Sequence, residues 1–401
     1  MLVTIIVFIL ILGVSIFVHE FGHFIFAKRR GVKVEEFGFG YPPRILGLKK
    51  VNGRRKLFFG NQKTEEIKSE DTIYSLNWLP IGGFVKIKGE AGEKAEDEDS
   101  FAHKKIWERG LIISGGVLMN FVLCMILLSI VFSLGSPQVI DKSNKNFKIK
   151  DERIEIISLL KDSPAEKAGL KIGDEILEVN GEKVYKIEDF KEKVNQSINQ
   201  PLNLKIKRFD KILEKKVIPR PLTEFKNISF QTEELEGSKA LIGVGLVKVG
   251  TISYPWYLAI WKGIKTTIIL IGKFIWFIFL MVKGLILGKG IKGGVTGPIG
   301  IAVLTNQVVH LGFIYLLQFT ALLSLNLGII NILPIPALDG GRLVFLLIEK
   351  IRGRKIKIEI ENAIHTFGFI ALMIIVLIVT YFDLARYGGK IIGVFKRTIG
   401  W

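Results

Sequence analysis

Cysteine and histidine are scarce in this chain of 401 residues, which contains one cysteine and five histidines. A single cysteine excludes an intrachain disulfide and a cysteine metal cluster. Cys124 lies inside an apolar run, where a small buried side chain is expected. A metal centre in this chain would therefore have to use histidine and carboxylate ligands.

A nucleic-acid-binding motif is also missing, although the formal net charge is +18. The basic residues are spread over loops that carry many acids as well, and a positive-inside bias with attraction to anionic lipid accounts for the excess. We therefore expect a lipid bilayer, and no nucleic acid, among the partners. A mean hydropathy of +0.38 alongside 23% charged residues also indicates a membrane protein whose charges are segregated from its apolar runs.

Four apolar stretches predict transmembrane helices. They lie in residues 1–27, 111–135, 311–341 and 363–401, the last with a short basic tail. The first has no basic segment before it and no small-residue cleavage site, so we expect a retained span rather than a cleaved signal. Cations follow it directly, and a basic loop at 342–362 separates the last two stretches. Both features predict cytoplasmic sides.

A further apolar stretch, 256–287, has two interpretations. It is long enough to cross a bilayer, but four lysines fall within an arc of roughly 80° on the helix, namely Lys262, Lys265, Lys273 and Lys283. We favour an amphipathic helix on the outer membrane surface, within a linker of residues 223–310, and a true span is the alternative. Four spans place residues 19–23 and Asp339 on the same side of the membrane, whereas five would separate them.

His19, Glu20 and His23 form an HExxH motif near the end of the first apolar stretch. Residues four apart lie on one face of an α-helix, so both imidazoles can reach one Zn²⁺. Glu20 would accept a proton from the water that this ion activates and return it to the leaving amine. The alternative is two unrelated core histidines. Polar groups are costly in a membrane-length apolar stretch, which favours a functional site.

A catalytic zinc usually has three protein ligands and one open position, so a third ligand is needed. The remaining histidines, His103, His310 and His365, are each more typical of an ordinary polar residue. Asp339 follows a proline-broken helix at the right depth, and we favour it as the third ligand. A second role, as the N-cap of a helix beginning near Gly341, is compatible with ligation because a carboxylate has two oxygens.

Residues 28–110 form the predicted cytoplasmic, membrane-associated β-region. Within them, Thr72–Trp78 and Phe84–Lys88 are β-like runs separated by Leu79–Gly83, and we expect a hairpin or strand pair with a glycine bend. In the second span Asn120 is the one strongly polar side chain. An interhelical hydrogen bond and a role near the metal are both open for it.

Residues 137–250 are water-soluble in character and, by helix counting, extracytoplasmic. Ser163–Pro164 predicts a capped short helix that ends at Gly169, followed by a strand over 175–179 and a tight turn at Asn180–Gly181. A second helix over 187–195 and strands over 202–208 and 213–218 complete the pattern. The run 163–181 resembles a bacterial-type PDZ domain, which we place at 150–222. Such modules bind extended peptides or C-termini by adding a strand.

Together, six stretches resemble the site-2 protease family of intramembrane zinc metalloproteases, in its bacterial RseP-type branch. They are His19–His23, Tyr74–Glu90, Phe101–Phe121, the PDZ run, Gly297–Ile301 and Ser324–Arg342. The resemblance implies a polytopic α-helical protein of the bacterial cytoplasmic membrane. It would have four transmembrane helices, an interfacial helix, a small membrane-associated β-element and an inserted extracytoplasmic α+β PDZ domain.

The resemblance also implies the roles of individual residues. It makes His19, His23 and Asp339 the ligands of one Zn²⁺ per chain and Glu20 the catalytic base. It assigns substrate handling to two groups, Asn326, Asn331 and Pro334 on the third span and Gly83, Phe84 and Val85 on the β-element.

We therefore predict a zinc-dependent endopeptidase that cleaves transmembrane segments of single-span proteins, such as anti-sigma factors or remnant signal peptides. The PDZ domain would take a peptide or a trimmed C-terminus and act as a size filter. The main alternative is a non-catalytic membrane adaptor that holds peptides through its PDZ domain. A zinc storage or transport site is a further alternative, disfavoured because no second cluster of His or Asp accompanies the first.

Overall fold

The computed structural model describes residues 2–51, 53–60, 71–140, 147–160, 162–208, 211–224, 239–288 and 297–399, with the side chains of 2, 81 and 387–399 left out. The chain divides into two compact units. One comprises Met1–Ile130 and Ile260–Trp401, and the other comprises Val131–Ala259.

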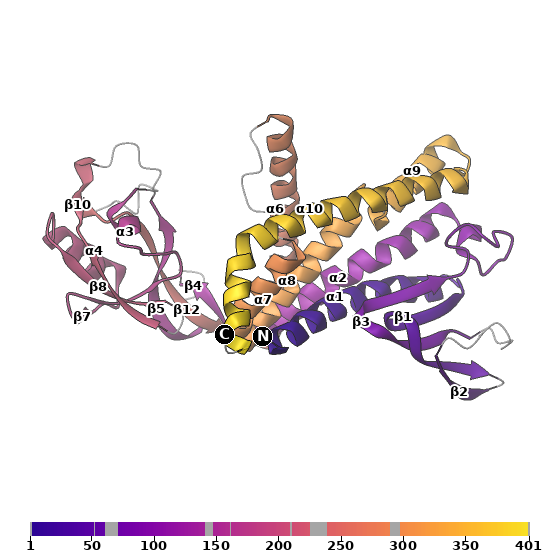
Figure 1. The fold of residues 1–401 in the computed structure, drawn as a ribbon, viewed down its shortest axis with the longest axis horizontal. Coiled ribbons are helices and arrows are strands. Elements are labelled where there is room, and N and C mark those ends of the chain that lie inside the picture. Colours follow the sequence, from indigo (N-terminus) through magenta and orange to yellow (C-terminus); the bar gives the residue numbers. More distant parts are fainter. Residues whose placement is uncertain are drawn as a thin grey trace. The chain divides into compact units, whose positions relative to one another are not determined.

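Long apolar helices dominate the first unit, as predicted (Figure 1). Five helices in the described part of the chain are long and apolar enough to cross a membrane: α1 (Leu2–Arg29), α2 (Ile106–Leu134), α6 (Trp256–Ile286), α8 (Phe313–Ile332) and α10 (Ile358–Ile399). Two shorter helices are α7 (Pro298–Leu311) and α9 (Asp339–Arg352). A polytopic membrane protein is therefore confirmed. The surface location of α6 stays a prediction, since its length and composition also satisfy a span.

Glycines allow α1 and α2 to cross closely. A Cβ at Gly22 would lie 2.2 Å from the carbonyl oxygen of Gly115, and a Cβ at Gly115 would lie 2.9 Å from that of Gly22. Small residues at such a crossing let two apolar helices approach backbone to backbone. The crossing places the HExxH turn of α1 directly against α2.

The sheet beside α1 has the order β2-β1-β3, with β1 at Val34–Val51, β2 at Arg54–Phe59 and β3 at Ile73–Ile87. The two predicted β-runs are both present within β3, but they do not pair with each other. Phe37 of β1 pairs with Tyr74 on one side and with Val85 on the other. The expected hairpin is therefore wrong, because a strand from earlier in the chain inserts between its two arms.

The bend in β3 lies on α1. Gly82 has φ +82°, and a Cβ there would lie 2.5 Å from Cγ2 of Ile16. Beyond the bend, residues 83–87 pair with β1 alone among the described residues, so they form an edge of the sheet. Gly83, Phe84 and Val85 therefore lie on an edge strand beside the helix that carries the HExxH motif.

The second unit contains a sheet in the order β4-β12-β5-β6-β8-β9, with β7 paired to β6. Its strands are Ser136–Val139, Val244–Ser253, Lys148–Leu159, Glu175–Val179, Leu202–Arg208 and Lys211–Val217, with β7 at Glu182–Lys183. The elements predicted for the PDZ segment are confirmed, including α3 (Pro164–Lys167) and α4 (Ile187–Gln196). The hydroxyl of Ser163 accepts a hydrogen bond from the Glu166 N–H at 3.2 Å, as an N-cap should.

One strand of this sheet comes from an unexpected part of the chain. Residues 244–253, predicted as part of the linker, instead form β12 between β4 and β5. Apolar residues such as Ile252, which is fully buried, explain this placement. Four short elements complete the description: η2 (Phe101–His103), η3 (Leu222–Glu224), and β10 (Arg220–Pro221) paired with β11 (Ala240–Leu241).

Candidate metal centre

The HExxH turn of α1 brings its two imidazoles together, as the four-residue spacing predicts. The Nε2 atoms of His19 and His23 are 3.3 Å apart, and both side chains are buried, with 5% and 9% of their residue surfaces exposed. With an oxygen of Glu20, these nitrogens lie within 4.8 Å of one another and form a group that could hold a metal ion.

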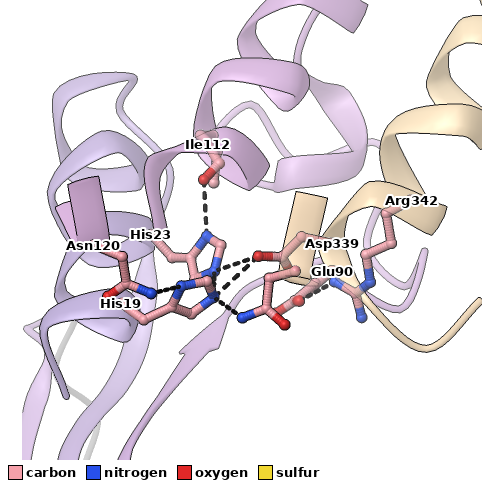
Figure 2. Close-up of polar contacts among 8 residues, drawn as sticks. His19, His23, Glu90, Ile112, Asn120, Asp339 and Arg342 are labelled. Carbon is pink, nitrogen blue, oxygen red and sulfur yellow. Dashed lines mark hydrogen bonds and ion pairs between the residues drawn. The ribbon is translucent and has the colours of Figure 1, made fainter. Parts of the chain in front are cut away.

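Asp339, although distant in sequence, lies beside the same two histidine nitrogens (Figure 2). Its Oδ2 atom lies 3.0 Å from Nε2 of His19 and 3.3 Å from Nε2 of His23. The oxygen is buried and makes no hydrogen bond to any other described group. Asp339 is the first residue of α9, whose N-cap is Leu338. The expected capping role for Asp339 is therefore wrong, and its carboxylate is directed at the imidazoles.

A break between α8 and α9 positions that carboxylate. Helix α8 ends at Ile332, because Leu333 precedes a proline and adopts extended backbone angles. The chain then turns so tightly that a Cβ at Gly340 would lie 2.1 Å from the carbonyl oxygen of Leu333. Glycine therefore allows the first turn of α9 to lie against the end of α8. Beyond it, α9 replaces part of the basic loop predicted at 342–362.

His365 contacts the turn between α8 and α9 rather than the group formed by His19, His23 and Asp339. Its Nδ1 accepts a hydrogen bond from the N–H of Ala337 at 2.8 Å, and Ala337 has a positive φ of 77°. An alanine in this region is strained, so the hydrogen bond stabilises a conformation that the backbone would otherwise avoid. The ring of His365 also packs against Phe345.

The three donor atoms fit a transition-metal ion. Nδ1 of His23 lies 2.9 Å from the carbonyl oxygen of Ile112 and must donate to it, which leaves the Nε2 lone pair of a neutral ring free for a metal. Two imidazoles and one carboxylate are a common ligand set of catalytic zinc sites. Space for the ion depends on Gly116, where a Cβ would lie 2.5 Å from Nε2 of His23.

Ion pairs connect α9, which carries Asp339, to its neighbours. Arg342, one turn after Asp339, donates to the carboxylate of Glu90 (Figure 2). Arg109 of α2 bridges to both oxygens of Glu349 at 2.9 and 3.1 Å. The loop that carries Glu90 begins at Lys88. The ammonium of Lys88 donates a hydrogen bond to the carboxylate of Asp99 and thereby lowers the pKa of Asp99. These ion pairs join the β-region and α2 to α9 around the centre.

The other predicted site residues are placed as follows. Nδ2 of Asn331 lies 3.3 Å from Nε2 of His19. Asn326 is five residues earlier on α8, hence about 140° around the helix and on another face. Pro334 is exposed just beyond the end of α8. His103 and His310 are exposed, and His103 contacts the backbone of Ala95.

Asn120 shows the limit of sequence reasoning about the site. Its amide lies 3.2 Å from Nδ1 of His19, and its oxygens lie near the hydroxyl of Ser324 on α8. Both alternatives therefore describe its position, since it bonds between helices and also lies beside a predicted zinc ligand. Glu90 and Arg342 lay inside matched motifs without any assigned role. Ser324, which contacts Asn120, also lay inside a matched motif without an assigned role.

Comparison with known proteins decides the family. Residues 7–59 and 54–375 match the model of peptidase family M50. The chain belongs to peptidase family M50. A protein of Clostridium acetobutylicum is 32% identical over 385 residues, covering 95% of this chain and 97% of its own. The regulator of sigma-W protease RasP of Bacillus subtilis is 28% identical, covering 96% and 98% of the two chains. The zinc metalloprotease RasP of Geobacillus kaustophilus is also 28% identical, with the same coverage.

The predicted enzyme class, a metalloprotease of the site-2 protease family, is thereby confirmed. Among solved structures, the PDZ domain of an SdrC-like protein from Listeria monocytogenes is 18% identical. It covers 25% of this chain and 92% of its own, with a TM-score of 0.20.

Proposed function

We propose that this M50 member is a zinc-dependent intramembrane endopeptidase that cleaves transmembrane segments of protein substrates. The supporting observation is that the donor atoms of His19, His23 and Asp339 lie within 3.3 Å of one another. The two histidines lie on the long apolar helix α1, and Asp339 is the first residue of α9. Helix α1 places Glu20 beside this point.

The chemistry divides between the ion and the protein. When bound, Zn²⁺ polarises a carbonyl and makes water a stronger acid. Glu20 accepts a proton from the attacking water and delivers it to the departing amine. His19, His23 and Asp339 would hold the ion, and the α1–α2 crossing would keep both rings facing Asp339.

A substrate helix must be unwound locally, because its carbonyls are hydrogen-bonded and its neighbours shield them. Within the described residues, the strand at 83–87 pairs on one side only, with β1, and its other edge could accept an extended segment by main-chain pairing. Phe84 and Val85 would contact its side chains. Asn331 and Asn326 on α8, and Pro334 just beyond its end, would replace helical hydrogen bonds or orient the scissile carbonyl.

We place the protein in a bacterial cytoplasmic membrane with the metal centre toward the cytoplasm. Lys28 and Arg29 at the end of α1, and the basic residues at 352–357, support this orientation through the positive-inside bias. The PDZ unit would then be extracytoplasmic, where it would bind a peptide or trimmed C-terminus and exclude untrimmed substrates. Anti-sigma factors and remnant signal peptides are suitable single-span substrates.

Metal content and cleavage, measured on the purified full chain in detergent, test the proposal. We expect about one zinc per chain and cleavage of a helical single-span substrate. A strong chelator should remove both, and added Zn²⁺ should restore both. A protein that contains no zinc, and does not take it up, would favour the non-catalytic adaptor instead.

Asn331→Ala should lower the cleavage rate by about tenfold to a hundredfold, which is the loss of one or two hydrogen bonds in the transition state. Zinc content should stay at the wild-type level, because the amide is not among the proposed ligands. Asn306→Ala on α7, which removes a hydrogen bond to Thr4, is the matched control. A wild-type cleavage rate for Asn331→Ala would remove this residue from substrate handling.

A further inference from the structure

A buried polar chain runs from His19 into α2 and α8. Asn120 and Ser324 both have 0% of their surface exposed. The Asn120 amide lies 3.2 Å from Nδ1 of His19 (Figure 2). The hydroxyl of Ser324 lies 3.1 Å from the backbone oxygen of Asn120 and 3.4 Å from its side-chain oxygen.

Metal ligation imposes a tautomer on His19. A neutral imidazole carries one proton, and the nitrogen that binds a metal must be the other one. Because Nε2 of His19 points at Asp339 and His23, the proton must be on Nδ1, and Nδ1–H needs an acceptor. His23 has a backbone acceptor, the carbonyl of Ile112. For His19 the corresponding contact is the amide of Asn120.

The amide can serve both tautomers. With its nitrogen toward His19, it donates to Nδ1, the ring proton moves to Nε2, and Ser324 donates to the amide oxygen. After a half-turn of the amide, its oxygen accepts from Nδ1–H and its nitrogen donates to Ser324, whose own proton goes to the backbone oxygen of Asn120. The amide of Asn120 and the hydroxyl of Ser324 are satisfied in both arrangements, but only the second leaves Nε2 of His19 free to bind zinc.

We propose that Asn120 is a positioning residue of the metal centre. Held by Ser324, its amide oxygen fixes His19 as the Nδ1–H tautomer and so sets the zinc affinity. The inference rests on the proposed ligation of zinc by His19. Partners of this kind typically change metal affinity by about 10- to 100-fold when they are removed.

Zinc affinity, measured on the full chain in detergent by competition with a chromophoric chelator, tests this role. Asn120→Leu removes the acceptor and should weaken zinc binding by about 10- to 100-fold. Asn120→Asp keeps an acceptor oxygen in the same place and should retain wild-type affinity or exceed it. Asn306→Leu, which removes an amide that bonds Thr4 near the first turn of α1, far along the helix from His19, should leave the affinity unchanged.

A purely structural role predicts a different pattern. If Asn120→Leu binds zinc as tightly as the wild type, or if Asn120→Asp loses as much affinity as Asn120→Leu, the positioning role is wrong. Ser324→Ala, a smaller change, covers the case in which Asn120→Leu does not fold. It should weaken zinc binding in the same direction, and unchanged affinity would overturn the role.

The wild-type measurement separates this inference from the function on which it rests. A wild-type chain that binds zinc, with His19→Leu losing it, upholds the ligation whatever the Asn120 variants do. A wild-type chain that binds no zinc overturns the ligation and the positioning role together.

Discussion

Replacing Glu20 with Gln should leave about one zinc per chain and lower the cleavage rate by about 10²–10⁴-fold, the usual contribution of a general base. The two side chains have the same shape, so the α1–α2 crossing and the three donor atoms should be undisturbed. Gln cannot accept a proton from water at neutral pH, and this step alone is lost.

The measurement pairs zinc content with the rate of cleavage of a helical single-span substrate by the purified full chain. Glu98→Gln is the matched control, because it makes the same substitution at an exposed loop position and should cleave at the wild-type rate. Cleavage by Glu20→Gln within a few-fold of the wild type would exclude Glu20 as the base. Loss of zinc in this variant would instead make Glu20 a ligand.

Gly116→Ala should damage the metal centre without changing a donor atom. The added methyl would lie 2.5 Å from Nε2 of His23 and 2.7 Å from Cε1 of His19, closer than such atoms can approach. Overlaps of this kind typically cost about 1–3 kcal/mol. If the rings pay this cost only when they hold zinc, the zinc affinity should fall by about 5- to 150-fold.

Gly272→Ala on α6 is the control for this substitution, because a Cβ there meets nothing within 4 Å. It should retain wild-type zinc content and thermal stability. Zinc competition and thermal unfolding, each measured with and without added Zn²⁺, separate damage to the centre from general destabilisation. Wild-type zinc affinity in Gly116→Ala would show that the rings can move without cost, contrary to the close contact with α2.

The β-region was the least predictable part of the fold from sequence. The two arms of β3 were detectable as local β-like runs, but β1 and β2 were not identified, and the pairing of residues 73–76 and 83–86 with the same part of β1 is non-local. Local patterns identify which residues form extended strands, but they do not identify the strand with which each one pairs. The same reason explains β12, whose ten residues look like a linker until β5 is placed beside them.

By itself the sequence indicated four of the five long apolar helices as spans, the HExxH histidine pair and the elements of the PDZ unit. These features rest on segment length, hydropathy, helical spacing and turn chemistry, all of which are local, whereas the protease family came from the resemblance of motifs along the chain. Only the tertiary structure decided that Asp339 meets His19 across 320 residues at 3.0 Å and that Asn120 faces the other nitrogen of the same ring. Those contacts depend on close crossings at Gly22, Gly116 and Gly340, which come from packing rather than from any local pattern.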